Sequence, residues 1–393
     1  MLKLLWVDFR HSALAMAAIA VLIAAAIALT PFIALTEQAL KEGGAKAAER
    51  FDLIVGGAQG ETQLTLSVVF LDRAVLPLMS GEIYEAIAKN PLAERAAPVA
   101  FGDYYDDMPV IGTTTDMFAS GRVSLGRAFE NEREAVAGAK TGLKIGDRFT
   151  PIHGSIGQSD AHIHEGVFYH VVGIASFGDA WDRAIMVSIE SIWNAHGMGR
   201  SFGSYPAVFG RGGVPPVSAV VVKPKTIAGA YELRSAYKRG ETQAVFAAET
   251  LAKLYGMLGD ISEALGKIAF AAQIFAAVVA AAAAMIYIRL KRRQIAVLRA
   301  FGADARRIFL VIFAQMTILG AFAAALGVAI GYAAATLASS AIAASRGFEA
   351  VARLADLDSA AVLTPLAILQ IALAIACAFS FRYSAAHYLK HNF

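Results

Sequence analysis

Four long apolar runs are the strongest constraint in this 393-residue sequence. They extend over about residues 14–35, 268–288, 308–338 and 360–381. A helix rises about 1.5 Å per residue, so about 20 apolar residues cross a hydrocarbon core about 30 Å thick. Each run therefore predicts a transmembrane helix. The composition agrees, because 57% of residues are hydrophobic and 17% charged, whereas soluble domains are typically about 25% charged.

A cleaved signal peptide is the alternative explanation of the first run, with Lys3 and Arg10 as its basic region. However, the run is about twice as long as the apolar part of a usual signal peptide, and no clear A-x-A cleavage site follows it. We therefore expect the run to remain in the chain as its first transmembrane helix.

Basic residues predict the orientation of the helices. Six arginines and one lysine lie in 289–307 with a single acid, Asp304, so this loop is expected in the cytoplasm. The 339–359 loop has no basic excess and is expected outside. Four crossings then place both termini in the cytoplasm, which agrees with Lys3, Arg10, Arg382 and Lys390. The large middle part of the chain is then expected outside the cytoplasm.

The middle of the chain predicts an inserted extracytoplasmic α+β domain. Segments 51–57, 168–174 and 218–224 are rich in strand-forming residues, and 80–90 and 228–239 have helical spacing. We expect an N-terminal cytoplasmic segment with the first helix (1–36), the α+β domain (37–262), a stalk with the second helix (263–290) and a cytoplasmic coupling helix or loop (291–307). The third helix (308–338), a short outer loop (339–359) and the fourth helix with a cytoplasmic C-terminus (360–393) are expected to follow.

The segment 248–267 has two interpretations. It has a helical pattern, but Gly256 and Gly259 weaken its middle, and Asp260 followed by Glu263 resembles a capping box that would restart a helix. The segment is then either a simple linker or a continuous stalk that carries motion between the domain and the membrane.

The sequence lacks the motifs of the commonest catalytic sites. The phosphate-binding pattern G-x-x-x-x-G-K-[ST] is absent, as are G-x-S-x-G, H-E-x-x-H and C-x-x-C. No basic stripe interleaved with aromatic residues predicts nucleic-acid binding. We therefore expect a non-catalytic chain without a cofactor of its own, and any ATP would be bound by a partner subunit.

Few polar residues interrupt the apolar runs, and no ionisable residue lies in the middle of one. We expect the amides to form hydrogen bonds between helices rather than to line a substrate path. Gly327 and Gly331 form a G-x-x-x-G pattern that permits close helix contact. The polar residues are Gln273, Gln315, Thr317, Thr336 and Gln370.

Four of the eight histidines lie close together in the middle of the chain, at His153, His162, His164 and His170. His162 and His164 would share one face of an extended strand, and imidazole and carboxylate groups together suit zinc. The alternative is a solvated polar loop, because serine, glycine and aspartate surround these histidines and no fixed zinc-finger spacing is present.

The basic loop predicts a short amphipathic helix. Ile295, Leu298 and Phe301 follow a three-residue spacing, with arginines around them, and Gly302 ends the helix. Such a helix suits docking of a cytoplasmic partner, although a helix lying on the membrane surface has the same pattern.

The same loop carries a family resemblance. Residues 292–303, RRQIAVLRAFGA, resemble the R-x-E-I-A-x-L-R-A-x-G-A pattern of the FtsX-like, MacB-type (type VII) permeases of ABC transporters, with Gln294 at the usual glutamate. Segments 51–60, 141–149 and 169–192 resemble the MacB periplasmic core, and the one-plus-three helix order agrees. The resemblance implies coupling to an ATPase through Arg292, Arg293, Gln294, Ile295, Leu298, Arg299, Phe301 and Gly302.

The resemblance implies a homodimeric permease in a bacterial inner membrane, with a separate ABC ATPase. ATP hydrolysis by that ATPase would move the extracytoplasmic domain of the permease, a coupling called mechanotransmission. Its substrate would be a lipoprotein, lipid, peptide or drug, and a periplasmic adaptor would be a further partner. Two alternatives remain open. An FtsX-like regulator of a cell-wall hydrolase has the same topology, and the histidines suggest a module for zinc-linked transport or sensing.

Overall fold

A computed structural model describes residues 13–58, 60–119, 121–154, 162–163, 166–198 and 214–391. The chain forms two compact units. The first, here called the helical unit, contains the chain up to residue 40, residues 258–340 and residues from 351 onward. The second, here called the inserted domain, contains residues 41–257 and 341–350.

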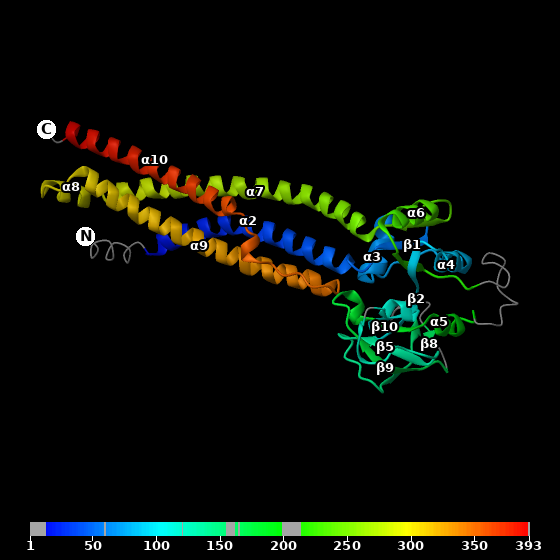
Figure 1. The fold of residues 1–393 in the computed structure, drawn as a ribbon. Helices are drawn as coiled ribbons and strands as arrows, with labels where there is room; N and C mark the ends of the chain where they lie inside the picture. Colours follow the sequence, from blue (N-terminus) through cyan, green and yellow to red (C-terminus); the bar gives the residue numbers. More distant parts are fainter. Residues whose placement is uncertain are drawn as a thin grey trace. The chain divides into compact units, whose positions relative to one another are not determined.

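Four helices of the described chain are long and apolar enough to cross a membrane (Figure 1). They are α2, α7, α9 and α10, and each contains one of the predicted apolar runs. The α-helices are α2 (Ala13–Ala48), α3 (Glu61–Phe70), α4 (Gly81–Ala88), α5 (Ile189–Ala195), α6 (Ile227–Tyr237), α7 (Ala247–Leu290), α8 (Arg292–Ala300), α9 (Ala305–Ser345) and α10 (Ser359–His391). Short 3-10 helices are η1 (Thr115–Phe118), η2 (Ala180–Arg183) and η5 (Leu354–Asp356).

The inserted domain is built on a mixed sheet with strand order β12-β1-β11-β2-β3-β10-β5-β9-β4. Three short strands extend it, with β6 on β9, β7 on β2 and β8 on β7. The strands are β1 (Leu53–Gly57), β2 (Ala93–Tyr105), β3 (Met108–Thr113), β4 (Val123–Gly126), β5 (Glu134–Gly138), β6 (Arg148–Phe149), β7 (Ile152–His153), β8 (His162–Ile163), β9 (Tyr169–Ala175), β10 (Ile185–Ser188), β11 (Ala219–Pro224) and β12 (Thr242–Val245).

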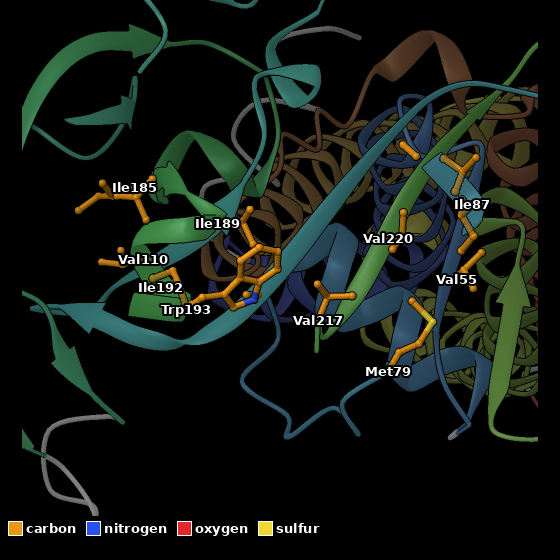
Figure 2. Close-up of a cluster of buried hydrophobic side chains, with 14 of the residues drawn as sticks. Val55, Met79, Ile87, Val110, Ile185, Ile189, Ile192, Trp193, Val217 and Val220 are labelled. Carbon is orange, nitrogen blue, oxygen red and sulfur yellow. The ribbon is translucent and has the colours of Figure 1, made fainter. Parts of the chain in front are cut away.

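The long strand β2 joins the two halves of this sheet. Its first part pairs with β11, and its second part pairs with β3 and β7 after an irregularity between Ala100 and Asp103. One buried apolar cluster lies along both halves. Figure 2 shows part of this core, including Val55, Val220 and Trp193. The predicted fold class, four apolar helices with an inserted α+β domain, is confirmed.

Local sequence signals explain where several elements of the inserted domain begin. The Ser80 side chain accepts a hydrogen bond from the Glu82 N–H at the start of α4, and Thr226 does the same for Gly229 at the start of α6. Such caps satisfy N–H groups that have no partner within the helix. Strands β1 and β10 are buried at every position, which explains their continuous apolar sequences.

The α7 helix includes the segment that precedes the second apolar run. It is continuous over 44 residues, as expected of a continuous stalk, and the transmission of motion along it stays a prediction. The predicted restart at Asp260 is wrong, because Asp260 and Glu263 lie inside the helix and Glu263 forms an ion pair of 2.7 Å with Lys267 one turn later. Gly256 has no heavy atom near its Cβ position and so costs only helix propensity.

The predicted hydrogen bonds between helices are confirmed for two of the three amides, Gln273 and Gln370. Gln273 donates to the Thr30 hydroxyl at 2.8 Å, and Thr317 donates to Gln370 at 2.9 Å. Thr336 instead donates to the Tyr332 carbonyl of its own helix, which a threonine reaches without leaving its turn. The Gln315 side chain is buried, and its Nε2 has no hydrogen-bond partner among the described residues.

The G-x-x-x-G pattern of α9 packs against α2. A methyl group on Gly327 would lie 2.6 Å from the Ala24 carbonyl oxygen, and one on Gly331 would lie 2.6 Å from Pro31 Cγ. The two helices therefore approach closely because neither glycine carries a side chain.

We expect Gly327→Ala and Gly331→Ala to destabilise the helical unit by about 1–3 kcal/mol each, because the added methyl groups overpack this contact. The matched control is Gly266→Ala in α7, where no heavy atom lies within 4 Å and alanine favours the helix by up to about 1 kcal/mol. Thermal unfolding in detergent, followed by fluorescence-detected size exclusion, compares the three variants. A loss of stability in the control equal to that at Gly327 would contradict the packing explanation.

Candidate functional site

The basic loop between α7 and α9 folds into the short helix α8. Its end is a Schellman motif, in which the Gly302 N–H donates to the Arg299 carbonyl at 2.9 Å and the Ala303 N–H donates to Leu298 at 3.0 Å. Gly302 has a φ of +84°, which a glycine adopts without strain. Two residues later, Asp304 begins α9 by accepting a hydrogen bond from the Arg306 N–H. Gly302 and Asp304 therefore determine where α8 ends and where α9 begins.

The apolar residues of α8 point in two directions. Ile295 packs on a buried cluster that includes Ile288, Ile308 and Cys377. Leu298 and Phe301 are 41% and 86% exposed. Successive steps of three residues rotate by about 60° around a helix with 3.6 residues per turn, so a three-residue spacing does not keep all three side chains on one face. The single face predicted from the sequence is therefore divided between an anchor and an exposed surface.

The exposed surface of α8 combines apolar and basic side chains. Val297, Leu298 and Phe301 are exposed beside Arg292, Arg293, Gln294 and Arg299, and no residue of α8 is fully buried. Exposed apolar groups rimmed by charges are typical of a surface that another molecule covers. We call Val297, Leu298, Arg299 and Phe301 the α8 surface.

The ends of three long helices lie within the inserted domain. Its compact unit includes the end of α2, the start of α7 and residues 341–350, here called the outer segment. Gly43 of α2 lies against Phe348 of the outer segment, and Gly44 lies against Tyr255 of α7. Four contacts hold the outer segment in the domain. Arg183 donates a hydrogen bond to the Ala344 carbonyl (2.6 Å), and the rings of Phe70 and Phe348 pack with their centroids 5.4 Å apart. Two ion pairs, Arg346–Asp72 and Lys140–Glu349, each have a distance of 3.4 Å.

A buried arginine follows α2 inside this domain. Arg50 pairs with Asp179 at 2.5 Å, and the side chains of the two residues are 13% and 3% exposed. The guanidinium carbon lies 4.1 to 4.8 Å from the ring centroids of Phe51, Phe177 and Trp181. Burial lowers the pKa of Arg50, and the Asp179 carboxylate opposes this shift. No local sequence pattern predicts this pair, because its two residues are 129 positions apart.

The histidines predicted as metal ligands do not all come together among the described residues. His153 in β7 lies 3.0 Å from the carboxylate of Asp103 and 2.8 Å from His196. His170 lies on β9, exposed and edge-on to Phe168. His162 faces His153 in the backbone register of β8 and β7. His164 lies outside the described residues, so the predicted set of four remains a prediction.

Two residues of this cluster, Asp103 and His196, were missed by the sequence analysis. His196 follows α5, and its Nδ1 lies 2.8 Å from the Ile192 carbonyl oxygen. Asp103 lies on β2 with its side chain fully buried. The hydrogen bond to Asp103 raises the pKa of His196, whereas burial opposes the rise. The one sequence feature that points to either residue is the carboxylate of Asp103, which lies in a segment rich in strand-forming residues.

The family comparison identifies the C-terminal part of the chain. Residues 266–392 match the family described as "FtsX-like permease C-terminal". This segment is therefore similar to the C-terminal part of FtsX-like permeases. The matched segment contains most of α7 and all of α8, α9 and α10, so the α8 surface lies within it. The predicted family resemblance is confirmed for this part of the chain.

Two solved structures resemble a part of the chain. The periplasmic region of MacB from Actinobacillus actinomycetemcomitans matches with 11% identity and a TM-score of 0.33, covering 53% of this chain and 94% of that one. The extracellular domain of the noncanonic ABC-type transporter YknZ from Gram-positive bacteria matches with 12% identity and a TM-score of 0.29, covering 49% and 98%. No curated protein sequence matches the chain.

Proposed function

We propose that this chain is the permease subunit of an ABC transporter and that the α8 surface docks a separate ATPase. The observation that carries the proposal is the position of this surface, exposed and basic, inside the segment similar to the C-terminal part of FtsX-like permeases. Ile295 and the Schellman turn hold α8 in place, and Leu298 and Phe301 are left for a partner. An ATPase would supply the phosphate-binding residues that this chain lacks.

The proposed action is mechanotransmission to an extracytoplasmic domain. Three of the four membrane-length helices have an end inside the inserted domain, and the α2, α7 and outer-segment ends pack on each other there. A change at the cytoplasmic ends of these helices would therefore reach the domain through helices rather than loops. The proposed location is a bacterial inner membrane with both termini in the cytoplasm, as the basic loop suggests.

The proposed assembly is a homodimer with its ATPases. A bundle of four helices is thin for a wide pore, so we propose that the substrate is handled by the outer domain. The substrate would be a lipoprotein, lipid, peptide or drug, and a periplasmic adaptor, lipoprotein or hydrolase would complete the system.

The α8 surface is tested by changing its apolar residues to aspartate. We expect Leu298→Asp and Phe301→Asp to abolish copurification of the ATPase from native membranes in mild detergent, because each places a desolvated charge in a docked interface. The matched control is Ile227→Asp on α6, where an isoleucine that is 80% exposed receives the same change. The control should retain the ATPase at the wild-type ratio.

Two outcomes would overturn the proposal. The absence of any ATPase with Walker motifs from the wild-type preparation would remove the transporter function. Full retention of the ATPase by both α8 variants would leave the transporter function in place but exclude this surface as the docking site.

A further inference from the structure

The cluster of Asp103, His153 and His196 brings three metal-binding side chains to one point in the inserted domain. One ligand atom from each lies within 4.8 Å of the other two. The Asp103 Oδ1 atom lies 3.0 Å from His153 Nδ1 and 3.4 Å from His196 Nε2, and the two ring nitrogens are 2.8 Å apart. Ligands about 2.0–2.1 Å from a tetrahedral zinc ion are about 3.4 Å apart. The observed spacings therefore need only small side-chain rotations.

The environment of His196 selects the ring nitrogen that faces the cluster. The Ile192 carbonyl oxygen lies 2.8 Å from Nδ1 and can only accept, so Nδ1 carries a proton. The other ring nitrogen, Nε2, faces Asp103 and His153, and a metal ion bound there would replace the proton that the hydrogen bond to Asp103 uses. Histidines that bind metals almost always donate their other ring N–H to a carbonyl or carboxylate in this way. The backbone of α5 thus orients His196 as a metal ligand.

The other two residues of the cluster, Asp103 and His153, lie on paired strands of the sheet. Asp103 in β2 and His153 in β7 are directly paired, and His162 in β8 is paired with His153. Gly102 has a φ of +142° at the irregularity of β2, a conformation that glycine adopts without strain. The irregular strand therefore requires a glycine directly before Asp103, the residue paired with His153.

Burial is graded across the three ligands. The Asp103 side chain is fully buried, whereas those of His196 and His153 are 19% and 34% exposed. A divalent cation held by two imidazoles would place a positive charge beside this buried carboxylate. The exposed side of His153 leaves access for a fourth ligand, as in zinc sites that keep an open position.

We propose that Asp103, His153 and His196 bind one zinc ion through one carboxylate oxygen and two imidazole nitrogens, with the fourth position open to water or another ligand. Imidazole nitrogen with a carboxylate oxygen is a donor set that suits zinc, and thiolates are not needed. The site does not depend on the proposed transporter function, because all three ligands lie in the inserted domain.

Zinc competition against a chromophoric chelator tests the site in the purified full-length protein after treatment with a chelator. We expect one zinc per chain in the wild type. His153→Ala, His196→Gln and Asp103→Asn should each weaken binding by at least about 100-fold, because even outer-shell partners change metal affinity by about 10–100-fold. His170→Ala is the matched control, since this histidine is exposed on β9, and it should bind zinc as the wild type does.

A second measurement separates lost ligands from lost folding. His196→Gln and Asp103→Asn keep polar side chains of similar size, and their thermal unfolding without metal should stay near that of the wild type. Zinc should raise the unfolding temperature of the wild type and the His170 control but not of these two variants. The cobalt complex of the wild type should show the visible bands of a tetrahedral site.

Three results would overturn the assignment. The first is a wild-type protein that binds neither zinc nor cobalt, which would make the cluster a hydrogen-bonded network only. The second is unchanged affinity in the His153 and His196 variants. The third is zinc binding that survives in those variants but is lost in a His162→Ala/His164→Ala variant, which would place the metal on other histidines.

Discussion

Asp179→Ala is expected to destabilise the inserted domain by about 3–5 kcal/mol, because it leaves the Arg50 guanidinium buried without its counter-charge. The three aromatic rings around Arg50 favour a cation but do not replace the carboxylate. Asp179 also accepts a hydrogen bond from the Trp181 N–H at 2.8 Å, which caps η2 and adds about 1 kcal/mol to the expected loss. A domain is typically stable by only about 5–15 kcal/mol.

Asp179→Asn separates the charge from the cap, because asparagine is an equally good capping residue. We expect it to lose most of the stability that Asp179→Ala loses. Adding Arg50→Met should restore much of that loss, since removing both charges of a buried pair is often neutral. Chemical denaturation in detergent, followed by tryptophan fluorescence, provides the double-mutant cycle.

The control is Glu85→Ala, which breaks the exposed Glu85–Lys89 pair of 2.6 Å. Exposed pairs one helical turn apart contribute only about 0.3–0.5 kcal/mol. If Asp179→Ala lowered the free energy of unfolding as little as this control does, the Arg50–Asp179 pair would not hold the start of the domain to η2.

The apolar runs predicted the membrane-length helices, but they did not predict where these helices end. The run that begins near residue 14 was expected to end at 35, and α2 continues to Ala48. The Gly43–Gly44 pair disfavours a helix by propensity. In the structure, Gly43 lies against Phe348 and Gly44 against Tyr255 so closely that side chains would not fit. Packing with distant residues thus decides this part of the helix, and no local pattern contains that information.

The same distinction applies to the candidate sites. The Gly302 turn and the amphipathic α8 depend on neighbouring residues, so the sequence predicted them. The histidine cluster depends on strand pairing and on the position of α5. His153 was noticed because other histidines lie near it in the sequence, whereas Asp103 and His196 become its neighbours only when β2 pairs with β7. The pairing register of two strands that are far apart in the sequence cannot be predicted from either segment alone.

Met257→Pro is expected to uncouple the inserted domain from ATP while leaving the ATPase bound, if the proposed function holds. A proline at this position removes the hydrogen bond to the Lys253 carbonyl and costs about 3 kcal/mol in a helix interior. Met257 is 69% exposed, so the change removes little packing. The α8 surface lies beyond the other end of α7, so docking should be unaffected.

Hydrogen exchange measured by mass spectrometry provides the test in the reconstituted complex of permease and ATPase. In the wild type, a non-hydrolysable ATP analogue should change exchange in the inserted domain. Met257→Pro should abolish this nucleotide-dependent difference, whereas Met257→Ala, which keeps the helix, should preserve it. The difference between the two nucleotide states is compared within each variant, so local fraying around the proline cancels. An unchanged nucleotide response in Met257→Pro would mean that α7 does not carry the signal, and that α2 and the outer segment are sufficient without it.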